Sequence, residues 1–363
     1  MESIGQECTF CVMDQSDPKI QFDTNGECNH CKSLRKELKE LLPLEKRREQ
    51  LNKLVQKIKE TSTKNEYDCV IGLSGGVDSS YLAYLVVKEL KLKPLAVHLD
   101  NGWNSELAVQ NIEQITSKLN IDLFTYVVDW DEFRSIQLAY LKASVIDIEV
   151  VSDQAIRNTL LKQALKFKIP YILSGNNIRT EGILPKEWYY NKSDQINLRA
   201  INKKFGTQKL NTYPQLTDWE QIKVRKMKKV DRLNILEYID FNKDDAKQLI
   251  INELGWRDYG GKHYESIFTR FYQGYILVNK FKIDKRRAHL SSLIASGQMS
   301  RPEAIMELKS SPYPSETMER DDYDFVLKKL GLKLEEFEKI MEKPIVRHDT
   351  FKIDQGLKKK YFG

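Results

Sequence analysis

Long apolar runs are missing from this sequence. No stretch reaches the roughly 20 residues that a bilayer-spanning helix needs, and the polar start from Met1 to Cys8 lacks the basic-then-apolar order of a secretion signal. Net charge is also small, because 58 basic and 52 acidic residues leave only +6 over 363 residues. Such a mild charge fits binding of small anions as well as binding of nucleic acid, so it decides little; nucleic acid is nevertheless an unlikely partner in our interpretation of the whole sequence. We therefore expect a cytoplasmic globular protein without a membrane span.

Cysteine is scarce and unevenly placed. Four of the five cysteines form two Cys-x2-Cys pairs, Cys8 with Cys11 and Cys28 with Cys31, separated by 16 residues. This spacing is typical of a tetrahedral zinc site closed by four thiolates. Because a module of 33 residues is too small to bury a core without a metal, we predict structural Zn²⁺ in residues 1–33. Two disulfides or a redox cluster are the alternatives.

The next segment, residues 34–64, is rich in Lys, Glu and Leu and is interrupted by Pro43. Apolar residues recur at helical spacing on both sides of the proline, which predicts two amphipathic helices. Residues 34–64 are therefore interpreted as a helical linker.

From residue 65 to about residue 235 the pattern alternates between short apolar runs and amphipathic stretches. The expected strands are 67–73, 94–99, 122–128 and 170–173. The expected helices are 77–90, 104–119, 130–143 and 152–167. This alternation predicts an α/β fold with a parallel sheet, helices on both faces, and ligands at the carboxyl ends of the strands. Beyond it, residues 236–363 read as a mainly helical substrate or partner region.

The most informative segment lies between the first expected strand and its helix, and it reads Ser74-Gly75-Gly76-Val77-Asp78-Ser79-Ser80. Adjacent glycines allow successive backbone N–H groups to converge, and the following helix adds its positive end, so an anion should bind there. The serines offer hydroxyl donors to phosphate. Because Asp78 faces phosphate favourably only through a cation, we assign it to Mg²⁺.

This segment is neither a Walker A loop nor a dinucleotide-binding turn. It resembles the PP-loop of the ATP pyrophosphatase superfamily, also described as HUP-like or adenine nucleotide alpha hydrolase-like, whose members split ATP between its α and β phosphates. The resemblance implies that ATP binds at three segments. Their residues are Ser74, Gly75, Gly76, Val77, Asp78, Ser79 and Ser80, then Asp100 and Asn101, then Ser174, Gly175 and Asn176. His98 lies inside a strand and is interpreted as a structural residue more readily than as a catalyst.

Sulfur transfer and ammonia transfer both occur in this superfamily, and the remaining cysteine helps to choose between them. Thiolation by a persulfide or an iron–sulfur cluster needs further thiols near the nucleotide. Cys69 is the only thiol left, and it sits inside an apolar strand, where it is most simply a core residue. The cysteine count therefore favours ammonia as the nucleophile.

The C-terminal region narrows the resemblance. Its motifs are 260–266 (GGKHYES), 269–275 (TRFYQGY), 280–287 (KFKIDKRR) and 300–304 (SRPEA). Together with the cysteine module, they resemble the N-acetyl sugar amidotransferases of pseudaminic acid and lipopolysaccharide O-antigen biosynthesis.

That resemblance implies conversion of an acetamido group, carried on a sugar or nucleotide sugar, into an acetamidino group with release of AMP and pyrophosphate. It also implies two separate partners, similar to the glutaminase and cyclase subunits of imidazole glycerol phosphate synthase, that supply ammonia. The chain itself has no cysteine in a glutaminase arrangement.

Within this C-terminal region, charged residues are the candidates for acceptor binding and proton transfer. Beside Asp78, the catalytic candidates are Lys262, Glu265 and Lys285. The substrate-binding candidates are His263, Arg270, Lys280 and Arg286. Ordinary surface charges are the competing interpretation for each of them. For the whole chain, a tRNA-thiolating enzyme and a non-catalytic nucleotide-binding zinc scaffold are the two alternative functions.

Overall fold

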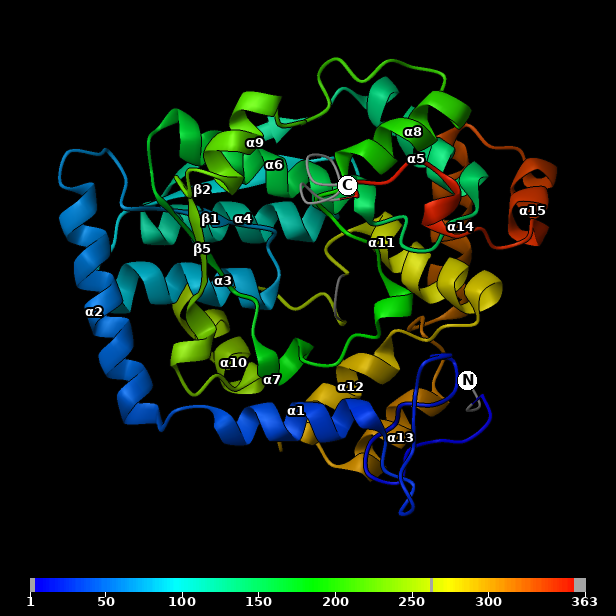
Figure 1. The fold of residues 1–363 in the computed structure, drawn as a ribbon, viewed down its shortest axis with the longest axis horizontal. Helices are drawn as coiled ribbons and strands as arrows, with labels where there is room; N and C mark the ends of the chain where they lie inside the picture. Colours follow the sequence, from blue (N-terminus) through cyan, green and yellow to red (C-terminus); the bar gives the residue numbers. More distant parts are fainter. Residues whose placement is uncertain (1–3, 262–263, 356–363) are drawn as a thin grey trace.

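The computed structural model describes residues 4–261 and 264–355, and its centre is a five-stranded parallel sheet (Figure 1). The spatial order is β3-β2-β1-β4-β5. The strands are β1 (Cys69–Gly72), β2 (Pro94–Asp100), β3 (Asp122–Val127), β4 (Tyr171–Ser174) and β5 (Asp231–Asn234). This arrangement confirms the α/β class with a parallel sheet.

Four of these strands lie within or beside the ranges expected from the sequence, whereas β5 was missed. Its sequence, Asp-Arg-Leu-Asn, is polar at three of four positions, and its exposed residues lack the apolar pattern of a buried strand. It pairs with β4 in register, with Ile172 opposite Arg232 and Ser174 opposite Asn234. The strand is therefore specified by its neighbour in the sheet more than by its own residues.

Helices cover both faces of the sheet, and alternate residues of each strand serve the two faces. In β1, Cys69 and Ile71 pack in a core with α2 (Leu44–Ser62), α3 (Val77–Tyr84), α4 (Glu106–Leu119) and α10 (Lys243–Leu254). Val70 packs on the opposite face against α6 (Val150–Lys166). In Figure 1, α6 and α9 (Asp218–Arg225) lie on one side of the strands, with α3 and α10 on the other.

The cysteine module lies against the C-terminal region. Its second pair leads directly into α1 (Asn29–Glu40), because the Cys28 side chain caps that helix. The Arg287 guanidinium donates to the Val12 carbonyl at 2.7 Å and pairs with Glu7 at 2.8 Å. Arg301 donates to the Cys11 carbonyl at 3.0 Å. The two ends of the chain thus form one packed unit.

The remaining helices lie in the sheet domain and in the C-terminal region. They are α5 (Trp130–Ala143), α7 (Ile178–Glu181), α8 (Gln195–Phe205), α11 (Ile267–Phe271), α12 (Arg286–Ala295), α13 (Arg301–Lys309), α14 (Glu316–Leu330) and α15 (Leu334–Glu342). Wider π-helical turns, η1 (Leu85–Glu89) and η4 (Tyr272–Phe281), extend α3 and α11, and short 3-10 turns occupy η2 (Lys186–Trp188), η3 (Ile235–Tyr238) and η5 (His348–Thr350). Among the described residues, no helix combines the length and apolar character needed to cross a bilayer.

The domain limits expected from the sequence, at residues 33, 64 and 235, stay predictions. The end of β5 at Asn234 and the start of α2 at Leu44 are consistent with a sheet domain between the two helical parts. The core packing, however, joins the cysteine module to the C-terminal helices.

Candidate active site

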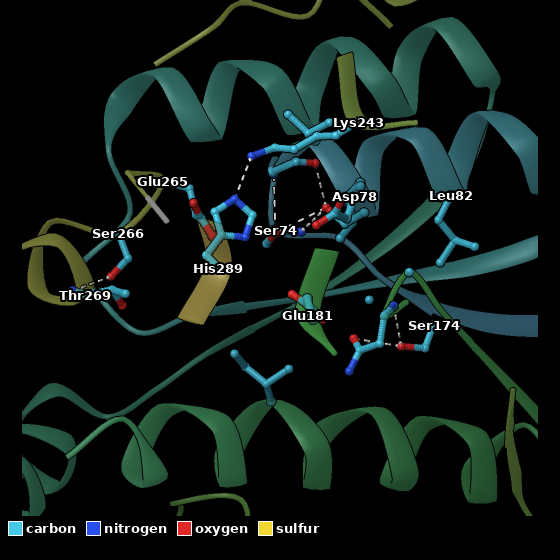
Figure 2. A pocket seen from close by; sticks show the side chains of 18 of the residues that line it. Ser74, Asp78, Leu82, Ser174, Glu181, Lys243, Glu265, Ser266, Thr269 and His289 are labelled. Carbon is cyan, nitrogen blue, oxygen red and sulfur yellow. Dashed lines mark hydrogen bonds between the residues drawn. The ribbon is translucent and has the colours of Figure 1, made fainter. Parts of the chain in front are cut away.

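A cavity of about 650 Å³ opens at the carboxyl ends of the strands (Figure 2). Residues at or just after the ends of β1, β2 and β4 line it, among them Ser74, Asn101 and Ser174. Residues from the C-terminal region form the facing wall, including Glu265 and His289. The cavity is therefore built jointly by the sheet domain and the C-terminal region.

The glycine-rich loop between β1 and α3 takes its shape from close backbone packing. Gly75 has a φ of +82°, and a Cβ there would lie 2.7 Å from the Ala108 carbonyl oxygen, so only glycine is accommodated. The Trp256 indole N–H donates to the Gly75 carbonyl at 2.8 Å. This bond gives the Gly75 carbonyl a buried partner from the segment after α10.

The three serines of the loop have different positions. Ser74 and Ser79 line the cavity, and their hydroxyl oxygens lie 3.1 Å apart. Ser80 is fully buried and donates to the Gly76 carbonyl at 2.7 Å. Ser79 also donates to the Gly76 carbonyl, at 3.1 Å. The serines that line the cavity are therefore Ser74 and Ser79, whereas the Ser80 hydroxyl stabilises the first turn of α3. Gly76, Val77 and Asp78 also line the cavity, but Gly75 does not.

The loop after β4 packs directly against the glycine-rich loop. A Cβ on Gly175 would lie 2.9 Å from the Asp78 carbonyl oxygen, so this close approach also requires glycine. Ser174 accepts from the Asn176 backbone N–H at 3.3 Å, and Ser174, Gly175 and Asn176 all line the cavity. The structure thus brings two of the three expected ATP-binding segments into contact.

The third expected ATP-binding segment follows β2, and only one of its two expected residues lines the cavity. Asn101 lines the cavity, whereas Asp100 lies outside its lining and accepts from the Gly102 backbone N–H at 2.9 Å. Asp100 therefore shapes the turn after β2, and its expected role in ATP binding stays a prediction.

His98 is buried beside this segment and lines the cavity. Its Nδ1–H donates to the Leu73 carbonyl at 2.9 Å, and its Nε2 accepts from the Asn104 side chain at 3.0 Å. Burial lowers the pKa of His98. Both ring nitrogens of the neutral imidazole therefore have hydrogen-bond partners, which agrees with the structural role expected from the sequence.

The C-terminal wall approaches the glycine-rich loop closely. A Cβ on Gly76 would lie 3.2 Å from Tyr259 Oη and 3.8 Å from Glu265 Oε1. Burial raises the pKa of Tyr259, and the negative charges of Glu265 and Asp78 raise it further. Two carboxylates, Asp78 and Glu265, therefore face the same small region beside the loop. Lys262 and His263, which precede Glu265, lie outside the described residues.

Lys285 reaches the cavity from the start of α12, where its Nζ lies 2.8 Å from Glu149 Oε2. Burial alone would lower the pKa of Lys285, but the charges of Glu149 and Asp147 outweigh that effect and raise it. Gln273 donates to the other Glu149 oxygen at 2.9 Å. Lys285 thus remains a cation held in place at the cavity wall, and the catalytic role expected for it stays a prediction.

Three other expected substrate-binding residues are outside the cavity lining and serve the structure of the C-terminal region. Arg270 forms two hydrogen bonds of 2.6 and 2.8 Å to the buried Asp322 carboxylate. Lys280 donates to the carbonyls at the end of α15, including Ile340 at 2.8 Å. Arg286 pairs with Asp284 at 2.7 Å. These contacts give Arg270, Lys280 and Arg286 structural partners in the C-terminal region, and the substrate-binding roles expected for them stay predictions.

Sequence reasoning missed several residues that the fold brings into the cavity. Lys243 and Lys247, one turn apart on α10, line it together with Arg232 of β5 and Glu149. Lys243 Nζ lies 3.4 Å from His289 Nε2. No short motif surrounds these residues, and the helical spacing of the two lysines was the only local signal.

The four cysteines of the N-terminal module form a compact cluster with the spacing of metal ligands. They are fully buried, and Sγ–Sγ distances are 3.7 Å for Cys8 and Cys31, and 3.6 Å both for Cys11 and Cys28 and for Cys28 and Cys31. In a tetrahedral site, four thiolate sulfurs that each lie about 2.3 Å from one ion are about 3.8 Å from one another. A four-iron cluster binds each thiolate through a different iron and holds the sulfurs farther apart. The donor set therefore fits a single tetrahedral ion such as Zn²⁺.

An α/β sheet with a glycine-rich phosphate loop, facing a helical C-terminal wall, defines a class of ATP-using enzymes. Residues 48–166 match the NAD synthase family. Residues 265–362 match the family described as LPS biosynthesis protein WbpG-like, C-terminal domain. The chain is thus an LPS-biosynthesis-related member of the PP-loop ATP pyrophosphatase superfamily.

The individual proteins that resemble this chain share little sequence identity with it. An uncharacterised protein of Methanocaldococcus jannaschii, MJ1599, is 23% identical over 337 residues, which is 90% of this chain and 100% of that protein. The U34-tRNA thiolase NcsA from Methanococcus maripaludis, with its [4Fe-4S] cluster, is 15% identical over 89% of each chain, with a TM-score of 0.36. NMN synthetase from Francisella tularensis is 14% identical over 62% of this chain and 91% of its own, with a TM-score of 0.31.

Proposed function

We propose that this protein is an ATP-dependent amidotransferase that converts the acetamido group of an N-acetylated sugar or nucleotide sugar into an acetamidino group. The observation that carries the proposal is the composition of the cavity. The PP-loop forms one wall, and WbpG-like residues such as Glu265 and Lys285 form the other. The phosphates and the acceptor would therefore meet in one cavity.

The PP-loop wall would hold the phosphates of ATP. Backbone N–H groups at the start of α3 and the hydroxyls of Ser74 and Ser79, which line the cavity, would offer donors to an anion, and the helix would add its positive end. Asp78 would hold Mg²⁺, because a carboxylate at this position faces phosphate favourably only with a cation between them; the ion would offset phosphate charge. Lys243 and Lys247 add positive charge to the same cavity.

The reaction needs an activated oxygen. An amide carbonyl is a poor electrophile because its nitrogen donates into it and its oxygen leaves reluctantly. Attack of that oxygen on the α-phosphorus of ATP releases pyrophosphate and makes the oxygen part of a good leaving group. Ammonia then adds to the carbon, loses a proton, and displaces AMP, which carries the former amide oxygen. Glu265, beside the PP-loop, is positioned to accept that proton.

The cysteines argue against sulfur as the nucleophile. All five lie within the described residues, and none lines the cavity. Four belong to the metal site, and Cys69 is fully buried in β1, where burial raises its pKa well above the usual range. A tRNA-thiolating reaction would need a thiol or a cluster in reach of the nucleotide.

Ammonia would come from separate subunits. Free ammonia is scarce at neutral pH because its conjugate acid dominates, and water in the cavity would return the activated intermediate to the amide. We therefore propose a glutaminase and a cyclase-like subunit, similar to those of imidazole glycerol phosphate synthase, that deliver ammonia directly.

The test supplies the purified protein with ATP, Mg²⁺, ammonium salt and a panel of acetamido nucleotide sugars. The expected products are AMP, pyrophosphate and an amidine of slightly lower mass than the acceptor. Pyrophosphate release only with tRNA would establish the thiolase alternative. ATP binding without turnover, even with the ammonia-supplying partners present, would establish a scaffold role.

A further inference from the structure

The positive charge of the protein is concentrated in one segment. Residues 195–230, which run from α8 through α9 to the residue before β5, carry nine basic and two acidic side chains and so have a net charge of +7. Because the whole chain carries +6, the rest of it sums to −1. The nine basic residues are Arg199, Lys203, Lys204, Lys209, Lys223, Arg225, Lys226, Lys228 and Lys229. Such an uneven distribution indicates a surface for an anionic partner.

Helix α9 and the turn after it combine basic with exposed apolar side chains. The helix has no buried residue, and residues 225–229 are all exposed. Trp219 and Ile222, three residues apart, are 58% and 37% exposed, and Met227 is 47% exposed. The Lys223 ammonium lies 5.6 Å from the centre of the Trp219 ring. Apolar and basic side chains mixed on one exposed surface are typical of helices that lie on membranes.

A basic groove on α8 extends this surface. Its volume is about 610 Å³, and Arg199, Lys203 and Lys209 line it, with no acidic residue among the described residues of its wall. The Arg199 guanidinium donates to Gln215 Oε1 at 2.5 Å, in the loop that leads into α9. In Figure 1, α8 and α9 lie along the same edge of the molecule, at the top of the view. Residues 219–229 and the three groove cations are called the basic surface below.

The apolar side chains distinguish between two classes of anionic partner. Nucleic acid is bound by cations along its phosphates and by aromatic rings that stack on its bases. Ile222 and Met227 have no aromatic ring and would gain nothing from stacking. A bilayer accepts all three apolar side chains, because its headgroup phosphates meet the cations while the acyl chains below take up any apolar group. The composition of the basic surface therefore favours a membrane.

We propose that the basic surface binds reversibly to a membrane that contains anionic phospholipid. Trp219, Ile222 and Met227 enter the headgroup region, and the surrounding lysines contact lipid phosphates. Each cation near such a surface adds to the affinity, and salt weakens the attraction by screening it. This binding determines where the protein acts and does not depend on the proposed reaction.

The test is co-sedimentation of the full-length protein with vesicles of phosphatidylcholine, with or without about 30% phosphatidylglycerol. We expect wild type to bind the anionic vesicles at least about 10-fold more tightly than the neutral ones, and to be released at about 0.5 M NaCl. Changing all four lysines of the surface to glutamine should weaken binding at least about 10-fold. Trp219→Ser, which keeps every charge, should weaken it at least about threefold. The four changes are Lys223→Gln, Lys226→Gln, Lys228→Gln and Lys229→Gln.

A matched control removes the same charge from exposed positions of α2, and it should bind the vesicles as wild type does. Its changes are Lys46→Gln, Lys53→Gln, Lys57→Gln and Lys59→Gln. Unchanged unfolding midpoints show that the variants are folded. Membrane binding is refuted if wild type binds neither vesicle, binds both equally, or binds tRNA but not vesicles. It is also refuted if the surface variant binds as tightly as wild type, and full affinity in Trp219→Ser would refute the insertion of the apolar side chains.

Discussion

Asp78 begins the first turn of α3 and lines the cavity, so it is the residue on which magnesium binding depends in our proposal. We predict that Asp78→Asn lowers pyrophosphate release about 100-fold or more, because charge neutralisation at the phosphates is lost. Pyrophosphate release and metal content report the two effects separately. The control Asp131→Asn, on the exposed start of α5, should keep wild-type activity, and retained turnover in Asp78→Asn would refute the assignment.

Arg270 offers a prediction on stability, because its partner Asp322 is only 8% exposed. Arg270→Met leaves a buried carboxylate without its cation, and we expect the free energy of unfolding to fall by about 3–5 kcal/mol. The double variant Arg270→Met/Asp322→Leu should recover part of that loss, although Tyr313 also donates to Asp322 at 3.2 Å. Urea unfolding measures both, and an unchanged stability in the single variant would contradict the structural role.

His98 predicts how stability depends on pH. Since burial lowers its pKa in the folded protein, the unfolded chain binds the proton first as the pH falls below about 6.5, and stability falls with it. One such proton changes the free energy of unfolding by at most about 1.4 kcal/mol per pH unit. Urea unfolding at pH 7.0 and 5.5 should therefore show a smaller pH effect in His98→Gln than in wild type. Equal effects would show that His98 is not the group responsible.

At the scale of elements, the cysteine module and helices α12 and α13 depend on one another through Arg287 and Arg301. We predict one bound Zn²⁺ per chain, and a fall of about 10 °C in the unfolding midpoint when Cys11→Ser removes a ligand, because metal binding contributes folding free energy. Elemental analysis and thermal unfolding measure the two effects. Cys69→Ala, outside the metal site, should keep the zinc, and full metal content in Cys11→Ser would contradict the site.

The elements also show which parts of the protein were predictable. The PP-loop is contiguous and lies between a strand and a helix, so its position followed from the order of residues. Arg232 and Lys243 reach the cavity only because β5 pairs with β4 and α10 packs on α3. Tertiary contacts of this kind leave no local pattern. The ion pair of Arg270 was equally hidden, since nothing near it in the sequence indicates that Asp322 is its partner.

At the scale of the whole molecule, the N-terminal and C-terminal parts pack together, and the C-terminal region forms the cavity wall opposite the sheet. This arrangement explains how one ATP-binding fold can be combined with a particular acceptor. In our proposal, the sheet domain binds the phosphates of ATP, and the WbpG-like region supplies the facing residues. Changing the C-terminal wall would change the acceptor while leaving ATP cleavage chemistry in place.

The central claim is that the amide oxygen of the acceptor attacks the α-phosphorus of ATP, and oxygen isotope transfer tests it most directly. An acetamido nucleotide sugar labelled with ¹⁸O in its amide carbonyl is incubated with the protein, ATP, Mg²⁺ and ammonium salt, and AMP is analysed by mass spectrometry. The account predicts that the label moves into AMP as the amidine forms. Unlabelled AMP, or ADP with inorganic phosphate, would contradict it.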